Sequence, residues 1–411
     1  MNIASKLSLR LVAIPALQYV ATSVASVSTV LIIVRVGGDV ADYGIANLLF
    51  NMFNALFAAI WPSILAGVER RLVLSIAYAC LSIAYGSLYL ARSVAAVWIV
   101  QMFVGIFTAL IPLTQTSIFV EIFGGRSRGI TVMCISMGLG WSLGLSIASV
   151  ARRLLDVFLI VLLLAAVPVA INAVLVLTLP KTLGVIEAHR VIALRKSFVM
   201  IVERARKIVT FEVPLKLPRF TSVRKLKPVE LYLLTCIMVF ISIATFFTTL
   251  PVYLKKIVGV DDSTMYLYSM CAGISSTISY ILQLRISDNL EKMLKAHILA
   301  LSTRTILFSL PLLLDGFVQG YFVLYALFGA TWAFIGGAQS IIVYNLSEPH
   351  RRDERVSHLN ACVSLGLIAG NILAAVLKST YGYELCFAIS SLLMLAAVCL
   401  ILRVKRRSLA M

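Results

Sequence analysis

Apolar residues occur in runs of about 20 that are bounded by short polar segments, and twelve such runs fill most of the 411-residue chain. A helix that rises about 1.5 Å per residue crosses a hydrocarbon core of about 30 Å with one run of this length. Helices are required because lipid offers no partner to open backbone groups. The runs therefore predict an all-α polytopic membrane protein, with helices near residues 11–34, 43–66, 72–90, 94–120, 129–151, 157–179, 230–250, 264–284, 296–314, 320–345, 356–377 and 383–403.

Composition agrees with this pattern, because 61% of the residues are hydrophobic and 13% are charged, whereas a soluble domain carries about 25% charged residues. A water-soluble enzyme is therefore excluded. The seven cysteines lie inside apolar runs, without a CxxC pair or a histidine at ligand spacing. They are typical of small buried hydrophobic residues, and we predict neither a metal site nor a cofactor.

The first apolar run follows Lys6 and Arg10 and passes small residues, as a cleavable signal peptide would. Its apolar character continues to Val34, which is longer than a typical signal core. We therefore expect it to remain as the first membrane helix.

The charge balance is +18, from 36 basic and 18 acidic residues, and in a soluble protein it would suggest nucleic acid. Placing the N-terminus in the cytoplasm puts 28 basic residues in the inner segments and seven in the outer ones. This bias is the positive-inside rule. It predicts an integral plasma-membrane protein with both termini cytoplasmic and no nucleic-acid partner.

A basic segment divides the chain into a half at 1–179 and a half at 229–411, each with six runs. The segment, 180–228, holds twelve Lys and Arg residues, and apolar residues from Val191 to Ile208 recur at three- and four-residue intervals. We predict an amphipathic helix against anionic lipid headgroups, followed by an extended linker. A regulatory or nucleic-acid role for the segment stays open as an alternative.

The two halves also share a weak repeat. Laying residues 100–119 over 324–343 matches Gly105 with Gly329 and Gln115 with Gln339. In the next run of each half, glycines recur four residues apart, at 140 and 144 and at 366 and 370. The repeat favours a duplicated six-helix unit.

Several loops resemble those of the major facilitator superfamily. The segment 284–292 (LRISDNLEK) is similar to the family's G-x-x-x-D-R-x-G-R-R loop at Asp288 and Lys292, and it departs from that motif at Leu284, Asn289 and Glu291. The stretch 249–254 (TLPVYL) resembles the end of the family's helix 7, and residues 121–129 resemble its loop between helices 4 and 5.

This resemblance implies two pseudo-symmetric six-helix halves that rock around a central site. Helices 1, 4, 7 and 10 are expected to line the cavity, and helices 3, 6, 9 and 12 to be peripheral. A loop carboxylate such as Asp288 would cap a helix and pair with arginines in one state, although a plain helix cap is the alternative. The residues assigned to the gating loops are Asp288, Lys292, Arg70, Arg71, Glu121 and Arg128.

Neutral polar residues dominate the helices that are expected to line the cavity. Amides, hydroxyls and aromatic rings suit a small organic solute, although interhelical hydrogen bonds explain them equally well. The candidates are Gln18, Thr22, Asn47, Asn51, Asn54, Gln101, Gln115, Thr245, Thr249, Tyr325, Trp332 and Gln339.

Arg304 is the one basic residue within a predicted span, and His297 lies on the same face of that helix. A charge at membrane depth is costly unless it is paired or borders a water-filled path. The pair is a candidate for anion binding or proton relay. A structural role, with hydrogen bonds to backbone carbonyls, is the alternative.

We therefore predict a secondary transporter, and no enzyme, that moves a small organic solute by alternating access and acts as a monomer in the lipid bilayer. A coupling ion is possible, but acidic residues are absent from the middle of every span, so a proton carrier is not evident. The alternatives are a transport-inactive sensor or scaffold, and an organic-anion transporter that uses Arg304.

Overall fold

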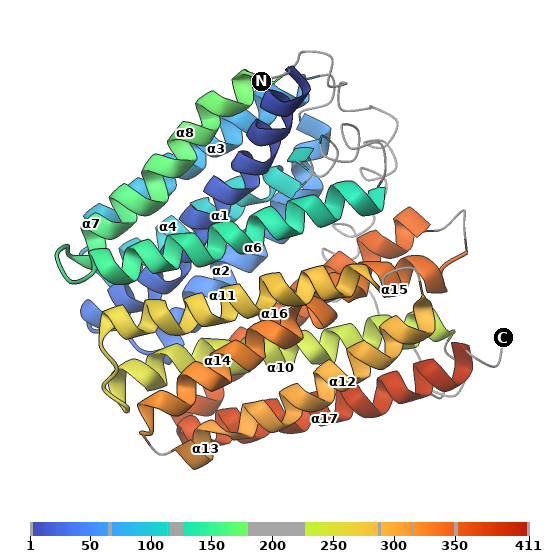
Figure 1. The fold of residues 1–411 in the computed structure, drawn as a ribbon. Helices are drawn as coiled ribbons and strands as arrows, with labels where there is room; N and C mark the ends of the chain where they lie inside the picture. The colour runs from blue at the N-terminus through green and yellow to red at the C-terminus, as the bar shows by residue number, and fades with distance from the viewer. Residues whose placement is uncertain are drawn as a thin grey trace, which may run out of the picture.

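The computed structural model describes residues 3–64, 68–112, 126–179, 227–286, 289–314, 316–348 and 352–408, together with Thr114, Gln115 and Ile118. These residues form a bundle of long helices in two groups, one from each half of the chain (Figure 1). The amphipathic helix predicted at 191–208 lies outside the described residues.

The first group follows the first six predicted spans. Its helices are α1 (Ile3–Arg35), α2 (Val40–Ile64), α3 (Arg70–Ser87), η1 (Leu88–Leu90), α4 (Val94–Thr108), α6 (Arg126–Ala151), α7 (Val157–Val161), the π-helical turn η2 (Leu162–Ala166) and α8 (Val167–Leu177). The first apolar run is thus part of the bundle, and α7, η2 and α8 form one continuous helix.

The second group follows the other six spans. Its helices are α10 (Pro228–Lys256), α11 (Asp262–Leu284), α12 (Leu290–Ser309), α13 (Pro311–Leu314), α14 (Val318–Trp332), the π-helical turn η4 (Ala333–Gly337), α15 (Ala338–Leu346), α16 (Arg352–Tyr381) and α17 (Tyr383–Ser408). Ten of the described helices are long and apolar enough to cross a membrane, and α2 and α11 pack lengthwise among them. The predicted all-α membrane fold of twelve spans is confirmed.

Glycines set the same close contacts in both groups. A Cβ at Gly105 would collide with the backbone of α2 at Phe50, and a Cβ at Gly329 would collide with the backbone of α11 at Ala272. Since α4 and α2 are the fourth and second spans of one half, and α14 and α11 those of the other, the two contacts are equivalent.

A second pair of contacts repeats this relation. Gly140 and Gly144 of α6 lie against the backbone of α1, and Gly366 and Gly370 of α16 lie against the backbone of α10. Small residues permit such close approach between membrane helices. The weak repeat in the sequence therefore marks equivalent packing positions in the two six-helix halves.

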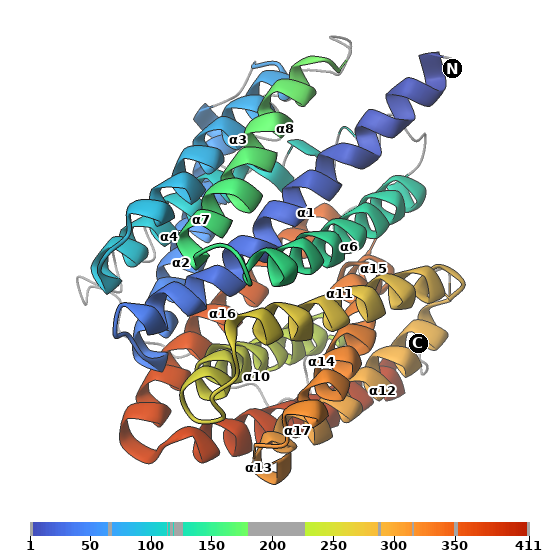
Figure 2. The same cartoon turned by 60° about the vertical axis from the view of Figure 1, so that its left-hand side comes forward.

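The halves meet where α6 packs along α11 and α2 packs along α16 (Figure 2). At the end of the bundle away from the chain termini, ion pairs cross this contact. Arg152 of α6 binds Asp262 of α11 with an Nη2–Oδ2 distance of 2.8 Å. Asp39, which precedes α2, pairs with Lys378 of α16 and lies 3.7 Å from Lys256 of α10.

Tight turns connect helices at this same end. The turns after α1, α10, α13 and α16 each contain a glycine with positive φ, at Gly37, Gly259, Gly316 and Gly382. Glycine tolerates this left-handed conformation, which ends a helix within one or two residues. The ion-paired end is therefore built from short connections.

Of the gating residues assigned by resemblance, Arg70, Arg71 and Lys292 are described with their side chains, and they lie at the opposite end. Arg71 pairs with Glu69 and donates to the Leu179 carbonyl, so it joins α3 to the end of α8 within one half. Arg70 begins α3, and Lys292 is exposed in the first turn of α12. Asp288, Glu121 and the side chain of Arg128 lie outside the described residues.

Candidate functional site

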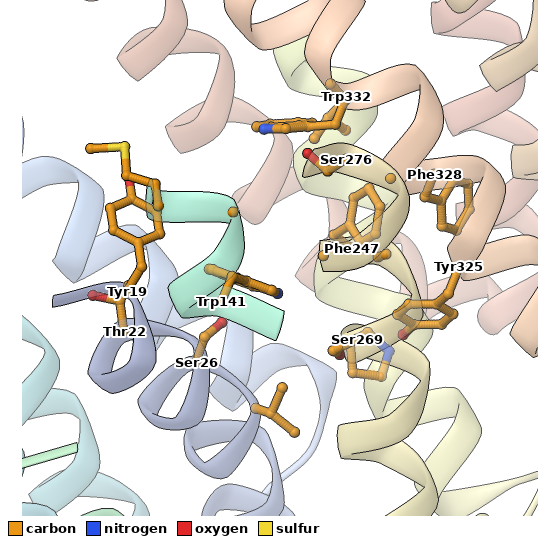
Figure 3. A pocket seen from close by; sticks show the side chains of 18 of the residues that line it. Tyr19, Thr22, Ser26, Trp141, Phe247, Ser269, Ser276, Tyr325, Phe328 and Trp332 are labelled. Carbon is orange, nitrogen blue, oxygen red and sulfur yellow. The ribbon is translucent and has the colours of Figure 1, made fainter. Parts of the chain in front are cut away.

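A cavity of about 550 Å³ lies between the two halves. Its wall is formed by α1, α2 and α6 on one side and by α10, α11, α12 and α14 on the other. Figure 3 shows Thr22, Ser26 and Trp141 on one side and Phe247, Ser276 and Trp332 on the other. A ligand held here would contact both halves.

The wall from the first half combines an aromatic pair with hydroxyl groups. Tyr19 of α1 and Trp141 of α6 have ring centroids 6.3 Å apart. Thr22 and Ser26 follow Tyr19 at three and seven residues, so that all three share one face of α1. The Thr22 hydroxyl donates to the Gln18 carbonyl of its own helix.

The wall from the second half is more aromatic and contains Arg304. The Arg304 side chain is 1% exposed and extends from α12 to α14. Its Nε donates to Thr331 Oγ1 at 2.8 Å, and its Nη2 donates to the Phe328 carbonyl at 2.7 Å. Nη1 has no hydrogen-bond partner in the described part of the chain.

Aromatic rings surround the Arg304 guanidinium. Its Cζ lies 5.1 Å from the ring centroid of Phe328, 5.5 Å from that of Phe247 and 5.6 Å from that of Trp332. The guanidinium makes no ion pair with a described acidic residue. Cation–π contacts are each worth about 0.5–2 kcal/mol, so rings and two hydrogen bonds stabilise this buried cation in place of a carboxylate.

The helix that begins as α14 changes from α-helical to π-helical geometry beside the cavity. Ala333–Gly337 forms a π-helical turn between α14 and α15, a feature that is frequent at functional sites. His297 of α12 is buried, and its Nδ1 lies 2.6 Å from the Phe334 carbonyl, to which it must donate. Arg304 and His297 therefore hold carbonyl oxygens on either side of the start of this turn, without contacting each other.

The structure brings three of the twelve cavity candidates to the cavity wall, namely Thr22, Tyr325 and Trp332. Other candidates make hydrogen bonds to residues of their own six-helix half instead of facing the cavity. Tyr78 donates to Gln18, Gln101 donates to Thr29 at 2.9 Å, and the Asn54 amide donates to the Gly105 carbonyl.

The remaining candidates also lie outside the cavity wall. Thr245 and Thr249 donate to carbonyls of their own helix, and the Asn51 amide donates to the Asn47 carbonyl in the same way. Gln115 and Gln339 are buried. Helix 4 was expected to line the cavity, but α4 contributes none of the described wall residues, because Gln101 faces α1.

Sequence reasoning missed the aromatic residues Tyr19, Trp141 and Phe247. Tyr19 is one position from the candidate Gln18, and one position turns a helix by about 100°. Trp141 stands among the close-packing glycines of α6, where a large ring is conspicuous. Arg304 was placed on a peripheral helix, and its length carries the guanidinium from α12 to the cavity.

Two six-helix halves around a central cavity define an integral membrane protein with the architecture of a secondary transporter. The sequence profile of the Major Facilitator Superfamily matches residues 11–346, and the chain belongs to this family. No curated protein matches the chain.

Solved structures of transporters share the fold. A proton-dependent oligopeptide transporter superimposes with a TM-score of 0.73 and 11% identity, covering 99% of this chain and 100% of the other. The nucleoside transporter NupG superimposes with a TM-score of 0.67 and 15% identity, covering 98% of this chain and 99% of the other. The human organic anion transporter MFSD10 superimposes with a TM-score of 0.62 and 15% identity, covering 98% of this chain and 100% of the other. Together with the family match to residues 11–346, these neighbours show that the chain has the fold of a Major Facilitator Superfamily membrane transporter.

Proposed function

We propose that this chain transports an organic anion and that the Arg304 guanidinium binds the negative group of the substrate. The observation that carries the proposal is the position of Arg304, a cation on the wall of the cavity between the halves. Its Nη1 group is a hydrogen-bond donor that has no partner among the described residues. Buried donors in native proteins are almost always satisfied. A substrate carboxylate is the partner that this site fits.

The electrostatics of the wall support the same choice. Among the described wall residues, Arg304 is the only charged side chain. A buried cation without a counter-ion is costly, and an anion in the cavity would remove that cost when it binds. A cationic substrate would increase it.

Access to Arg304 requires a small local movement. The guanidinium is almost fully covered, with the rings of Phe247 and Trp332 beside it on the cavity wall. We expect rotation of one of these rings to open a path from the cavity to the guanidinium, and the carboxylate would then replace the ring as the partner of the cation. The organic anion transporter MFSD10 is one of the fold neighbours, which is compatible with this substrate class.

Alternating access would follow from the contacts between the halves. The ion pairs that Asp39 and Asp262 make with basic residues of the other half would close the cavity at the end away from the chain termini. The cavity would then exchange solute at the end where the termini lie. The excess of basic residues in the segments predicted to be inner supports a plasma-membrane orientation with both termini cytoplasmic. The conformation described here would then face the cytoplasm.

Ligand-dependent stabilisation of the purified protein tests the proposal. Naphthoate, naphthylmethylamine and naphthamide have similar rings and carry a negative, a positive and no charge. We expect naphthoate alone to raise the melting temperature, and Arg304→Gln to weaken its binding about 10- to 100-fold, as loss of a charged hydrogen bond of about 1.5–3 kcal/mol requires. Arg304→Lys should retain part of the affinity.

Arg92→Gln is the matched control, because the Arg92 guanidinium also lies over rings, 4.4 Å from the Phe158 centroid, but is absent from the cavity wall. Uptake of naphthoate into proteoliposomes, with and without a pH gradient, then separates transport from binding and tests proton coupling. Binding without uptake would favour the sensor alternative. Equal binding of all three probes, or anion binding unchanged in Arg304→Gln, would refute the proposal.

A further inference from the structure

The rings on the cavity wall come from both halves and favour a flat ligand. Tyr19 and Trp141 belong to the first half, and Phe247, Tyr280 and Trp332 to the second. Aromatic rings pair with other rings in offset or edge-to-face geometry, and each pair strengthens binding about 2- to 10-fold beyond area burial. An aromatic ring system between these walls would contact both halves, whereas an aliphatic chain would forgo the ring pairing.

The single charge on the wall limits the charge of the ligand. Since Arg304 is the one charged residue among the described wall residues, one anionic group has a partner there. A second carboxylate, or the ammonium of an amino acid, would be buried without a counter-charge, and this weakens binding. The wall therefore favours one negative charge and disfavours dianions and zwitterions.

Three serine hydroxyls supply a second polar feature. Ser26 of α1 and Ser269 and Ser276 of α11 all lie on the wall, and none of the three hydroxyl groups makes a hydrogen bond with a described residue. Ser269 and Ser276 are seven residues apart and so share one face of α11, with Ser26 on the opposite side of the cavity (Figure 3). Hydroxyl groups donate and accept hydrogen bonds without charge, and they match an uncharged polar substituent.

From these three features we infer that the substrate is an aromatic monocarboxylate that carries an uncharged hydrogen-bonding group such as a hydroxyl. The carboxylate binds Arg304 of the second half, the ring system lies between Trp141 and Trp332, and the polar substituent reaches the serines. This inference rests on the proposed anion transport and specifies its substrate class.

Four probes test the inference by their dissociation constants, measured by isothermal titration calorimetry. Hydroxynaphthoate isomers should bind most tightly. The dissociation constant of the best isomer should be about 2- to 10-fold lower than that of naphthoate, as one additional hydrogen bond provides. Decanoate, an aliphatic monocarboxylate, should bind at least about 5-fold more weakly than naphthoate because it lacks ring pairing. Naphthalenedicarboxylate should bind about 100-fold more weakly than naphthoate.

Variants locate the contacts. The triple variant with Ser26, Ser269 and Ser276 changed to alanine should bind hydroxynaphthoate and naphthoate equally, and Ser87→Ala is the control, since its hydroxyl donates to a carbonyl of its own helix outside the cavity. If the triple variant does not fold, the probe series on the unaltered protein decides the inference alone.

The outcomes separate this inference from the proposed function. If decanoate and naphthoate bind equally and both depend on Arg304, the aromatic substrate class is wrong and anion transport stands. If the dicarboxylate binds as tightly as naphthoate, the limit to one charge is wrong. If hydroxynaphthoate gains nothing over naphthoate, the polar substituent is wrong. If no anion depends on Arg304, both the inference and the proposed function fail.

Discussion

The fourth and tenth spans, which contain α4 and α14, are equivalent in the duplicated fold. Each makes the same kind of backbone contact within its own half, but their side-chain chemistry differs. Gly105 of α4 lies against α2, and Gly329 of α14 lies against α11. On α4, the Gln101 amide turns away from the cavity and donates to Thr29 of α1. On α14, Tyr325 occupies the corresponding position and lines the cavity.

The difference shows which part of the duplication was retained. Close glycine contacts position the helices in both halves, since any side chain there would push two backbones apart. The side chains near these glycines differ between the halves, and on α14 they include two of the rings around Arg304, Phe328 and Trp332. The packing is thus symmetric, while the one charged side chain among the described wall residues and most of the rings on the wall belong to the second half.

Adding one methyl group at the shared contacts should have the largest effect. Gly329→Ala and Gly105→Ala each force the helices apart, at a cost of about 1–3 kcal/mol, and should lower the melting temperature and the yield of monodisperse protein by similar amounts. Gly86→Ala is the control, because its nearest neighbour would be Ala166 at 3.8 Å. A large effect at one glycine only would show that the two contacts are not equivalent.

Removing the hydrogen bond to the π-helical turn should have a smaller effect that is confined to the continuous helix of α14, η4 and α15. His297→Leu leaves the partly buried Phe334 carbonyl without its side-chain donor, at a cost of about 1–3 kcal/mol, partly offset by the added apolar packing. Thermal unfolding of His297→Leu compared with the exposed His358→Leu measures this. Equal melting temperatures would mean that the bond does not stabilise the turn.

Weakening the ion-paired end should change the conformational balance more than the stability. Asp262→Asn removes the carboxylate that Arg152 and Lys255 share, with Lys255 Nζ at 2.5 Å. We expect faster labelling of a Ser26→Cys reporter by an impermeant maleimide added from that end, in a background without native cysteines. Glu291→Gln, whose partner Lys295 is one turn away on the same helix, should leave the rate unchanged. Unchanged labelling in Asp262→Asn would show that this carboxylate does not hold the end closed.

The smallest effect concerns the cap of α11. Burial raises the pKa of Asp261, but the hydrogen bonds from the Thr264 hydroxyl and backbone amide lower it by more than burial raises it. The pKa therefore lies below its ordinary value. The stability from this carboxylate is present at neutral pH and is lost as the pH falls through its pKa, below about 4. The difference in melting temperature between the unaltered protein and Asp261→Ala should therefore narrow between pH 6 and pH 3. A constant difference would mean that ionisation of the cap contributes nothing.

Much of the architecture was determined by the sequence alone. Twelve apolar runs of membrane length require helices, because lipid leaves the backbone no other partners. The recurring glycines already marked the equivalent contacts, since only a residue without Cβ permits them. These features depend on spacing along the chain, which is a one-dimensional property.

The tertiary structure decided which residues face the cavity. Tyr19 faces it and Gln18 does not, although one residue separates them, because each step turns the helix by about 100°. The length of the Arg304 side chain carries its charge from a peripheral helix to the central wall. Helix rotation and the reach of side chains between helices are set by packing in three dimensions, so the cation and the rings that define the proposed site met only in the folded protein.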